Sequence, residues 1–83
     1  MPNEELFETL GEELKNQIRV RRSLREELEA IDLYDERIAQ TKDKELKRIL
    51  EHNRDEEKEH VAMLMEWLRK HDAEQDAAFR QHD

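Results

Sequence analysis

The chain has 83 residues, of which 15 are Lys or Arg and 23 are Asp or Glu, so its formal net charge is −8. It contains one Gly, one Pro and no Cys. Residues 1–83 are long enough for a single domain only, and so few Gly and Pro residues argue against a multi-stranded sheet. The lack of Cys excludes disulfide scaffolds, thiolate metal sites and cysteine nucleophiles.

The charge and hydropathy of the chain also limit its partners. A strongly negative protein is a poor ligand for nucleic acid or for an anionic membrane. No apolar run approaches the roughly 20 residues of a membrane span, and the N-terminal residues lack the basic-then-apolar pattern of a signal peptide. We therefore expect an all-α protein in the cytoplasm. Because a short polar chain buries little surface alone, we also expect a homo-oligomer.

The first predicted helix runs from about residue 4 to residue 38, and its start has two interpretations. Thr9 begins a capping-box sequence that ends at Glu12. Asn3 is the alternative N-cap, which would leave Gly11 inside the helix. Apolar residues recur along this helix at steps of three, four or their sums, which is the helical period: Leu10, Leu14, Ile18, Leu24, Leu28, Ile31 and Ile38.

A short polar connection, residues 39–43, follows this helix. A second helix is predicted over about residues 44–70, with Asp43 as its N-cap. Asp72 begins another capping-box sequence, which predicts a short third helix over about residues 73–81. A connection of this length suits antiparallel neighbours. The expected fold is an antiparallel two-helix hairpin plus a short C-terminal helix.

Polar residues interrupt the apolar stripe of the second helix at its middle, where Asn53, Glu57 and His60 stand. A helix that only packed would carry Leu or Ile there, because burying a carboxylate in an apolar seam costs several kcal/mol unless it is paired. On the first helix, Glu27 borders the apolar stripe in the same way. In an antiparallel hairpin residue 27 lies opposite about residues 55–57, so these polar residues are expected at one level.

Glu57 and His60 form a Glu-x-x-His sequence, which places a carboxylate and an imidazole one turn apart on one helix face. Dinuclear centres of four-helix bundles take such a pair from each of two helices and one Glu from each of the other two. This chain carries one of each. We therefore predict that a two-fold dimer forms a ferritin-like four-helix bundle, with a dinuclear metal site at its interface. The ligands would be Glu27, Glu57 and His60 of both chains, whose four carboxylates balance two divalent cations.

Other interpretations of these residues remain open. His60 alone would also suit a core histidine that is bonded to a carbonyl group, and Asn53 would suit a residue that sets the register of a coiled coil. The alternative functions are a non-enzymatic helical assembly protein and a dimer that a structural Zn or Mn ion bridges.

Two stretches of the chain resemble the encapsulated ferritins, ferritin-like ferroxidases that are cargo of encapsulin nanocompartments. The first is EELEAIDLYD at residues 26–35, and the second is HNRDEEKEHVAM at residues 52–63, followed by EWLR at residues 66–69. The similarity covers about residues 20–73. It implies a ferroxidase that oxidises Fe(II) with oxygen at a di-iron centre across a dimer interface. It also implies a decamer of five dimers and an encapsulin shell as partner, in which the iron is stored.

The resemblance carries over to single residues as well. Glu27, Glu57 and His60 would be the iron ligands, with two iron ions per dimer. Tyr34 would lie next to these ligands without binding iron.

Glu26 and Glu29 would resemble the acidic residues through which metal reaches the centre. Leu33 is a departure from the resemblance, because a relative in this family carries a tryptophan at that position, beside the acidic residues. The family's apolar targeting peptide, which docks on the shell, does not occur in the sequence up to Asp83.

Overall fold

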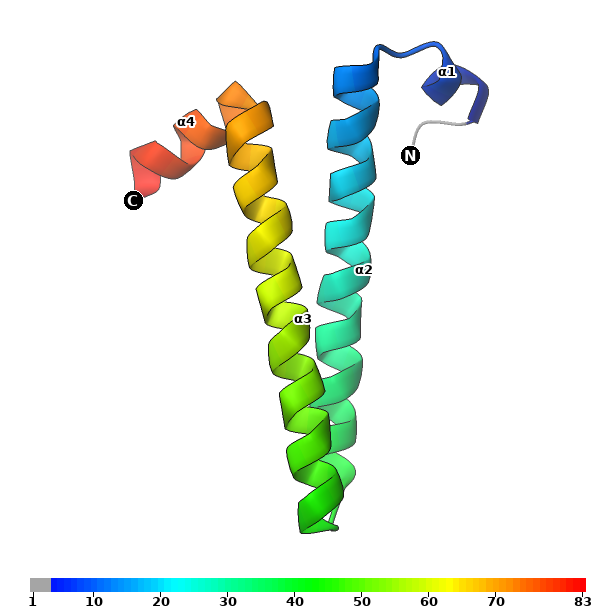
Figure 1. Cartoon of the computed structure of the whole chain (residues 1–83), viewed down its shortest axis with the longest axis vertical. Helices are drawn as coiled ribbons and strands as arrows, with labels where there is room; N and C mark the ends of the chain where they lie inside the picture. Colours follow the sequence, from blue (N-terminus) through cyan, green and yellow to red (C-terminus); the bar gives the residue numbers. More distant parts are fainter. Residues whose placement is uncertain (1–3) are drawn as a thin grey trace.

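The computed structural model of the protein describes residues 4–83, and all regular structure in that range is helical. The helices are α1 (Glu4–Glu8), α2 (Glu12–Gln40), α3 (Lys44–His71) and α4 (Ala73–His82). Figure 1 shows α2 and α3 running side by side in opposite directions, with α1 and α4 at the end far from their connecting loop. We call that end the open end of the hairpin. The predicted all-α hairpin with a short C-terminal helix is confirmed.

The N-terminal part differs from the single helix expected over about residues 4–38, because the structure contains two helices there. The Thr9 hydroxyl does not cap α2; it donates a hydrogen bond to the carbonyl oxygen of Leu6 at 2.7 Å and so belongs to the turn that ends α1. Gly11 is the N-cap of α2, with φ −69° and ψ 155° and no side-chain hydrogen bond. The alternative cap, Asn3, lies outside the described residues.

The loop between α2 and α3 is shorter than the expected polar connection, because α2 continues to Gln40. The Thr41 hydroxyl donates to the carbonyl oxygen of Arg37 and so satisfies one of the last carbonyl groups of α2. The Asp43 carboxylate accepts a hydrogen bond from the backbone N–H of Leu46 at 2.9 Å. Asp43 is therefore the N-cap of α3, as the sequence predicts.

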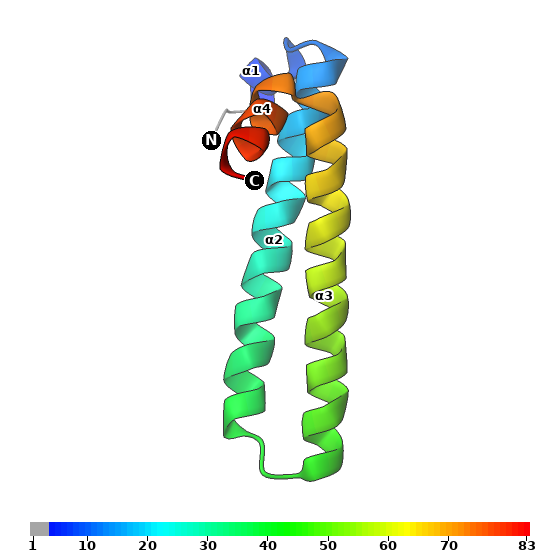
Figure 2. The same cartoon turned by 90° about the vertical axis from the view of Figure 1, so that its left-hand side faces the viewer.

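An elbow at Asp72 joins α3 to α4. The Asp72 carboxylate accepts a hydrogen bond from the Gln75 backbone N–H at 3.1 Å and pairs with Arg21 of α2 at 3.0 Å. The hydrogen bond from Gln75 is the main reason that the pKa of Asp72 lies below its ordinary value, and the contact with Arg21 lowers the pKa further. Gln17 of α2 donates to the carbonyl oxygen of His71 at 2.8 Å. The elbow is thus tied to α2, at the end of the hairpin where Figure 2 shows α1 and α4.

The core of the described chain is thin, which follows from its extents of 49 × 35 × 15 Å. Within residues 6–83 only four apolar side chains are buried: Phe7, Leu24, Ile38 and Leu68. Large apolar side chains are exposed on both long helices, namely Leu14, Leu28, Leu33, Leu46, Ile49 and Met63. No helix in the described range has the length and apolar character needed to cross a membrane. The hairpin alone therefore leaves apolar surface uncovered on α2 and α3.

Candidate metal centre

Glu27, Glu57 and His60 meet near the middle of the hairpin. The first stands halfway along α2 and the other two halfway along α3. One ligand atom from each of the three lies within 4.8 Å of the others. Nδ1 of His60 is 3.5 Å from Oε2 of Glu27 and 3.4 Å from Oε2 of Glu57. Among the residues that the structure describes, no other group of three or more His, Cys, Asp or Glu side chains has such geometry.

The surroundings of these side chains fit a bound cation. The Glu57 and Glu27 side chains are 22% and 26% exposed, whereas His60 is 48% exposed. Oε2 of Glu27 is buried and accepts no hydrogen bond. A buried oxygen without a partner is unfavourable, and a cation beside it would remove that penalty. Two carboxylates and an imidazole are donors that suit divalent Fe, Mn or Zn.

A shallow hollow of about 290 Å³ adjoins the three side chains, and Ser23, Glu27, His60, Met63 and Leu64 line it. Met63 is 67% exposed there. Three protein ligands leave a four- to six-coordinate ion incomplete. The cluster therefore presents an unfinished set of ligands on the outside of one hairpin.

The sequence analysis did not single out Ser23 or Met63 as neighbours of the cluster. Helical spacing could have found both, since Ser23 stands one turn before Glu27 and Met63 three residues after His60.

Tyr34, Glu26 and Glu29 are not part of the cluster in the isolated chain. Cζ of Arg37 lies over the Tyr34 ring, 5.8 Å from the centroid of the ring. Within residues 4–83 no hydrogen bond joins Tyr34 to a residue of the cluster. Glu26 and Glu29 are exposed on α2, and so is Leu33, at 43%. The assignments of Tyr34, Glu26 and Glu29 therefore stay predictions.

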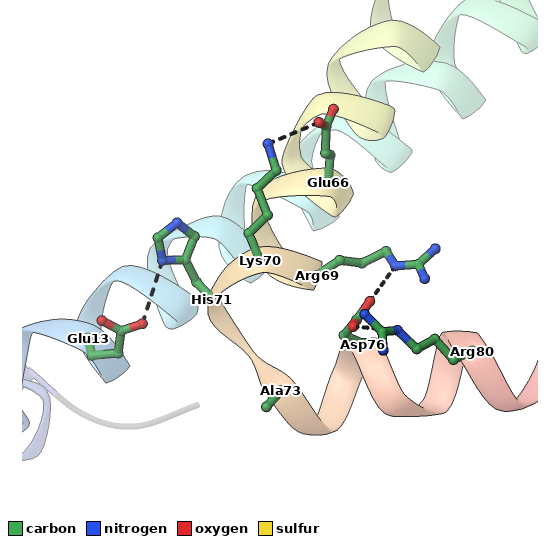
Figure 3. A pocket seen from close by; sticks show the side chains of 8 residues that line it. All are labelled: Glu13, Glu66, Arg69, Lys70, His71, Ala73, Asp76 and Arg80. Atoms are coloured by element: carbon green, nitrogen blue, oxygen red, sulfur yellow. Dashed lines mark hydrogen bonds and ion pairs between the residues drawn. The ribbon is translucent and has the colours of Figure 1, made fainter.

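A larger hollow, of about 750 Å³, lies at the elbow between α3 and α4. Figure 3 shows its charged side chains in separate groups, one around Asp76, one of Lys70 with Glu66, and one of His71 with Glu13. Nε of Arg69 is 2.8 Å and Nε of Arg80 is 3.0 Å from the Asp76 carboxylate. The Arg69 hydrogen bond is the main reason that the pKa of Asp76 is lowered. Lys70 pairs with Glu66 at 3.1 Å. These paired charges explain how the elbow is held together rather than how a ligand would bind.

Known proteins resemble the chain over most of its length. The EncFtn-like family model matches residues 3–82. The encapsulated ferritin-like protein of Rhodospirillum rubrum is 56% identical over 69 residues, which are 83% of this chain and 49% of that protein. The ferritin-like protein of Thermotoga maritima is 52% identical over 76% of this chain and 55% of its own length.

A third relative is the encapsulin nanocompartment cargo protein EncC of Myxococcus xanthus, which is 41% identical over 70% of this chain and 45% of its own length. The chain thus spans about half the length of the curated relatives that it matches. The crystal structure of protein ne0167 from Nitrosomonas europaea superposes with a TM-score of 0.87 at 51% identity, over 98% of this chain and 89% of that one. The resemblance noted in the sequence is confirmed, and the chain belongs to the EncFtn-like family.

Proposed function

We propose that the chain is a ferroxidase that oxidises Fe(II) with oxygen at a di-iron centre shared by two copies of the hairpin. The observation that carries this proposal is the meeting of Glu27, Glu57 and His60, within 4.8 Å, on the outside of a single hairpin. Each hairpin offers two carboxylates and one imidazole. A two-fold dimer would offer four carboxylates and two imidazoles, the ligand set of dinuclear four-helix bundles.

The uncovered apolar surface supports a dimer on this face. Met63 lines the hollow beside Glu27 and is 67% exposed. Ile49, which is 50% exposed, stands eleven residues before His60. At about 100° per residue, Ile49 and His60 point within roughly 20° of each other. A second hairpin would therefore cover apolar side chains and complete the ligand set together, and burial of that surface would favour association.

The donor set suits the proposed chemistry, in which iron is the substrate. Carboxylate oxygens favour Fe(III), and the imidazole of His60 maintains affinity for Fe(II). Glu27 contributes a carboxylate from α2, and the one-turn spacing of Glu57 and His60 contributes the other two donors from α3. Each of the two Fe(II) ions would give one electron to dioxygen. Glu26 and Glu29 would attract Fe(II) toward the centre, and Tyr34 would lie next to the ligands.

Family membership supports a partner and a compartment for this iron oxidation. The relative named as an encapsulin cargo protein supports an encapsulin shell as the partner, and the names of the two other relatives support iron handling. The proposal therefore includes five dimers in a decamer, held inside an encapsulin compartment of the cytoplasm, where the oxidised iron is stored.

An anaerobic titration with Fe(II), followed by a pulse of oxygen, tests the proposal. Iron bound per chain, particle mass by light scattering and oxygen uptake are recorded together. We expect saturation near one iron per chain, growth in mass with metal, and rapid oxygen uptake. Glu57→Gln and His60→Ala should abolish the uptake. Glu59→Gln and His52→Ala are matched controls, because both residues are exposed on α3 outside the cluster, and both should behave like the original chain.

Two results would contradict the proposal. Stable assembly without tight iron binding or oxygen uptake would identify a non-enzymatic helical assembly protein. Equal stabilisation by Zn²⁺ and Mn²⁺ without oxygen uptake would identify a structural metal site.

A further inference from the structure

Two Arg–Asp ion pairs of equal length hold α2, one to α3 and one to the elbow that follows α3. Asp35 pairs with Arg54 at 3.0 Å on the loop side of Glu27, and Arg21 pairs with Asp72 at 3.0 Å at the open end. Among the described residues, the Asp35–Arg54 pair is the only side-chain hydrogen bond or ion pair that joins the two helices on the loop side of Glu27. It is therefore the polar contact that ties that half of the hairpin together.

Near the cluster, apolar packing only weakly fixes the relative register of α2 and α3. On α2 no side chain between Leu24 and Ile38 is buried, and on α3 none before Leu68 is buried. A slip of one helical turn would move α3 by about 5.4 Å against α2. That displacement exceeds the 4.8 Å within which the ligand atoms of the cluster lie. The relative register of α2 and α3 therefore decides whether the cluster exists.

Arg54 is well placed to hold that register. It stands three residues before Glu57, one turn along the same helix, and Asp35 stands about two turns beyond Glu27. Its side chain is 23% exposed, and its guanidinium contacts both Asp35 and, through Nε at 3.2 Å, Asp55 of its own helix. The planar fork of an arginine loses little freedom when it already holds one carboxylate. The hydrogen bond to Asp35 is the main reason that the pKa of Arg54 is raised.

We propose that Asp35 and Arg54 are positioning residues of the metal centre, because the ion pair between them sets the register that brings Glu27 to Glu57 and His60. This inference rests on the metal site of the proposed function. It assigns no contact with metal to either residue.

The test compares the two ion pairs, with Arg21→Gln as the matched control for Arg54→Gln. Co²⁺ binding to the purified chain is measured by calorimetry and by the d–d absorption of the bound ion. We expect Arg54→Gln and Asp35→Asn each to weaken Co²⁺ binding by up to about five-fold, the upper range for a partly exposed ion pair. Both variants should also change the absorption spectrum, and the double variant should be no worse than either single one. Arg54→Lys should restore part of the affinity.

Arg21→Gln removes an ion pair of the same length at the open end, where Asp72 stands twelve residues after His60, so it should lower the thermal stability but leave the Co²⁺ affinity within two-fold. The inference would be overturned by an Arg54→Gln chain that binds Co²⁺ with the original affinity and spectrum. It would equally be overturned if Arg21→Gln weakened binding as much.

A second measurement needs no metal, so it separates this inference from the proposed function. Because the chain lacks Cys, cysteines introduced at exposed Asp32 and Lys58 would carry spin labels at unique sites. In chain diluted with unlabelled protein, Arg54→Gln should broaden the distribution of distances between the labels, and Arg21→Gln should not. An unchanged distribution overturns the inference. If the original chain binds Co²⁺ but consumes no oxygen with Fe(II), the ferroxidase proposal is contradicted. The positioning role of Asp35 and Arg54 is then unaffected.

Discussion

Nδ1 of His60 on α3 lies 3.5 Å from Oε2 of Glu27 on α2, an oxygen that is buried and accepts no hydrogen bond. This contact is an ion pair only while the imidazole is protonated. Metal binding, however, requires a neutral imidazole and an ionised carboxylate. The arrangement is therefore better suited to a bound cation than to the metal-free chain.

Replacing Glu27 by Leu should stabilise the metal-free chain while it abolishes metal binding. The substitution removes a buried oxygen that lacks a hydrogen bond, which is worth about 1 kcal/mol. We expect a higher melting temperature in the presence of a chelator. The melting temperature of the original chain should rise with added metal, because metal binds the folded state, and that of the variant should not. Glu26→Leu is the control, because Glu26 is exposed. A Glu27→Leu chain that melts lower without metal would contradict the prediction.

A charge at Met63 should prevent metal-dependent dimerisation. Met63 is 67% exposed and lines the hollow beside Glu27 and His60, so a dimer across this cluster would bury it. A glutamate there would have to be desolvated next to carboxylates, which is unfavourable by several kcal/mol. Light scattering during a metal titration should show Met63→Glu remaining at the mass of the unassociated chain. Ala62→Glu places the same charge on an exposed neighbouring position and should still dimerise. Dimers of Met63→Glu would mean that another face associates.

The sequence was informative wherever a local pattern decides the structure. The apolar period predicted both long helices, and the caps at Asp43 and Asp72 form with the expected hydrogen bonds. The helical spacing of Glu57 and His60 and the level of Glu27 predicted that these side chains meet.

The remainder depended on competition between groups, which a pattern does not reveal. The Thr9 hydroxyl had a carbonyl oxygen of the preceding turn within reach, and it donates to Leu6 instead of capping α2. Asp35 and Arg54 belong to separate charged stretches, and only the register of the folded hairpin pairs them. The position of Tyr34 relative to the cluster in an assembly depends on how a second copy packs. The residue pattern of one chain does not reveal that packing.

The elbow between α3 and α4 should weaken in acid. The pKa values of Asp72 and Asp76 are held below the ordinary value of 3.8, mainly by hydrogen bonds from the Gln75 backbone and from Arg69, respectively. A carboxyl group with a lowered pKa in the folded state stabilises that state above its ordinary pKa, and the contribution is lost as the pH falls toward the lowered value. In an NMR titration toward acid, the Gln75 amide signal should begin to move only below pH 3.8. Signals that report exposed carboxyl groups should move at higher pH. In Asp72→Asn this acid transition should be absent, and a persisting transition would assign it elsewhere.

Gly11→Ser should stabilise the chain by strengthening the start of α2. Gly11 is the N-cap at φ −69°, a conformation open to any residue, and nothing lies within 4 Å of a Cβ built there. A serine would restrict the unfolded chain, and its hydroxyl would accept a hydrogen bond from the first turn of α2, together worth about 0.5–1 kcal/mol. Thermal and urea unfolding should both show the gain. Gly11→Ala restricts the unfolded chain equally but offers no acceptor, so it should be less stable than Gly11→Ser. Equal stability of the two variants would mean that the first N–H groups of α2 gain nothing from a side-chain cap and are satisfied by water.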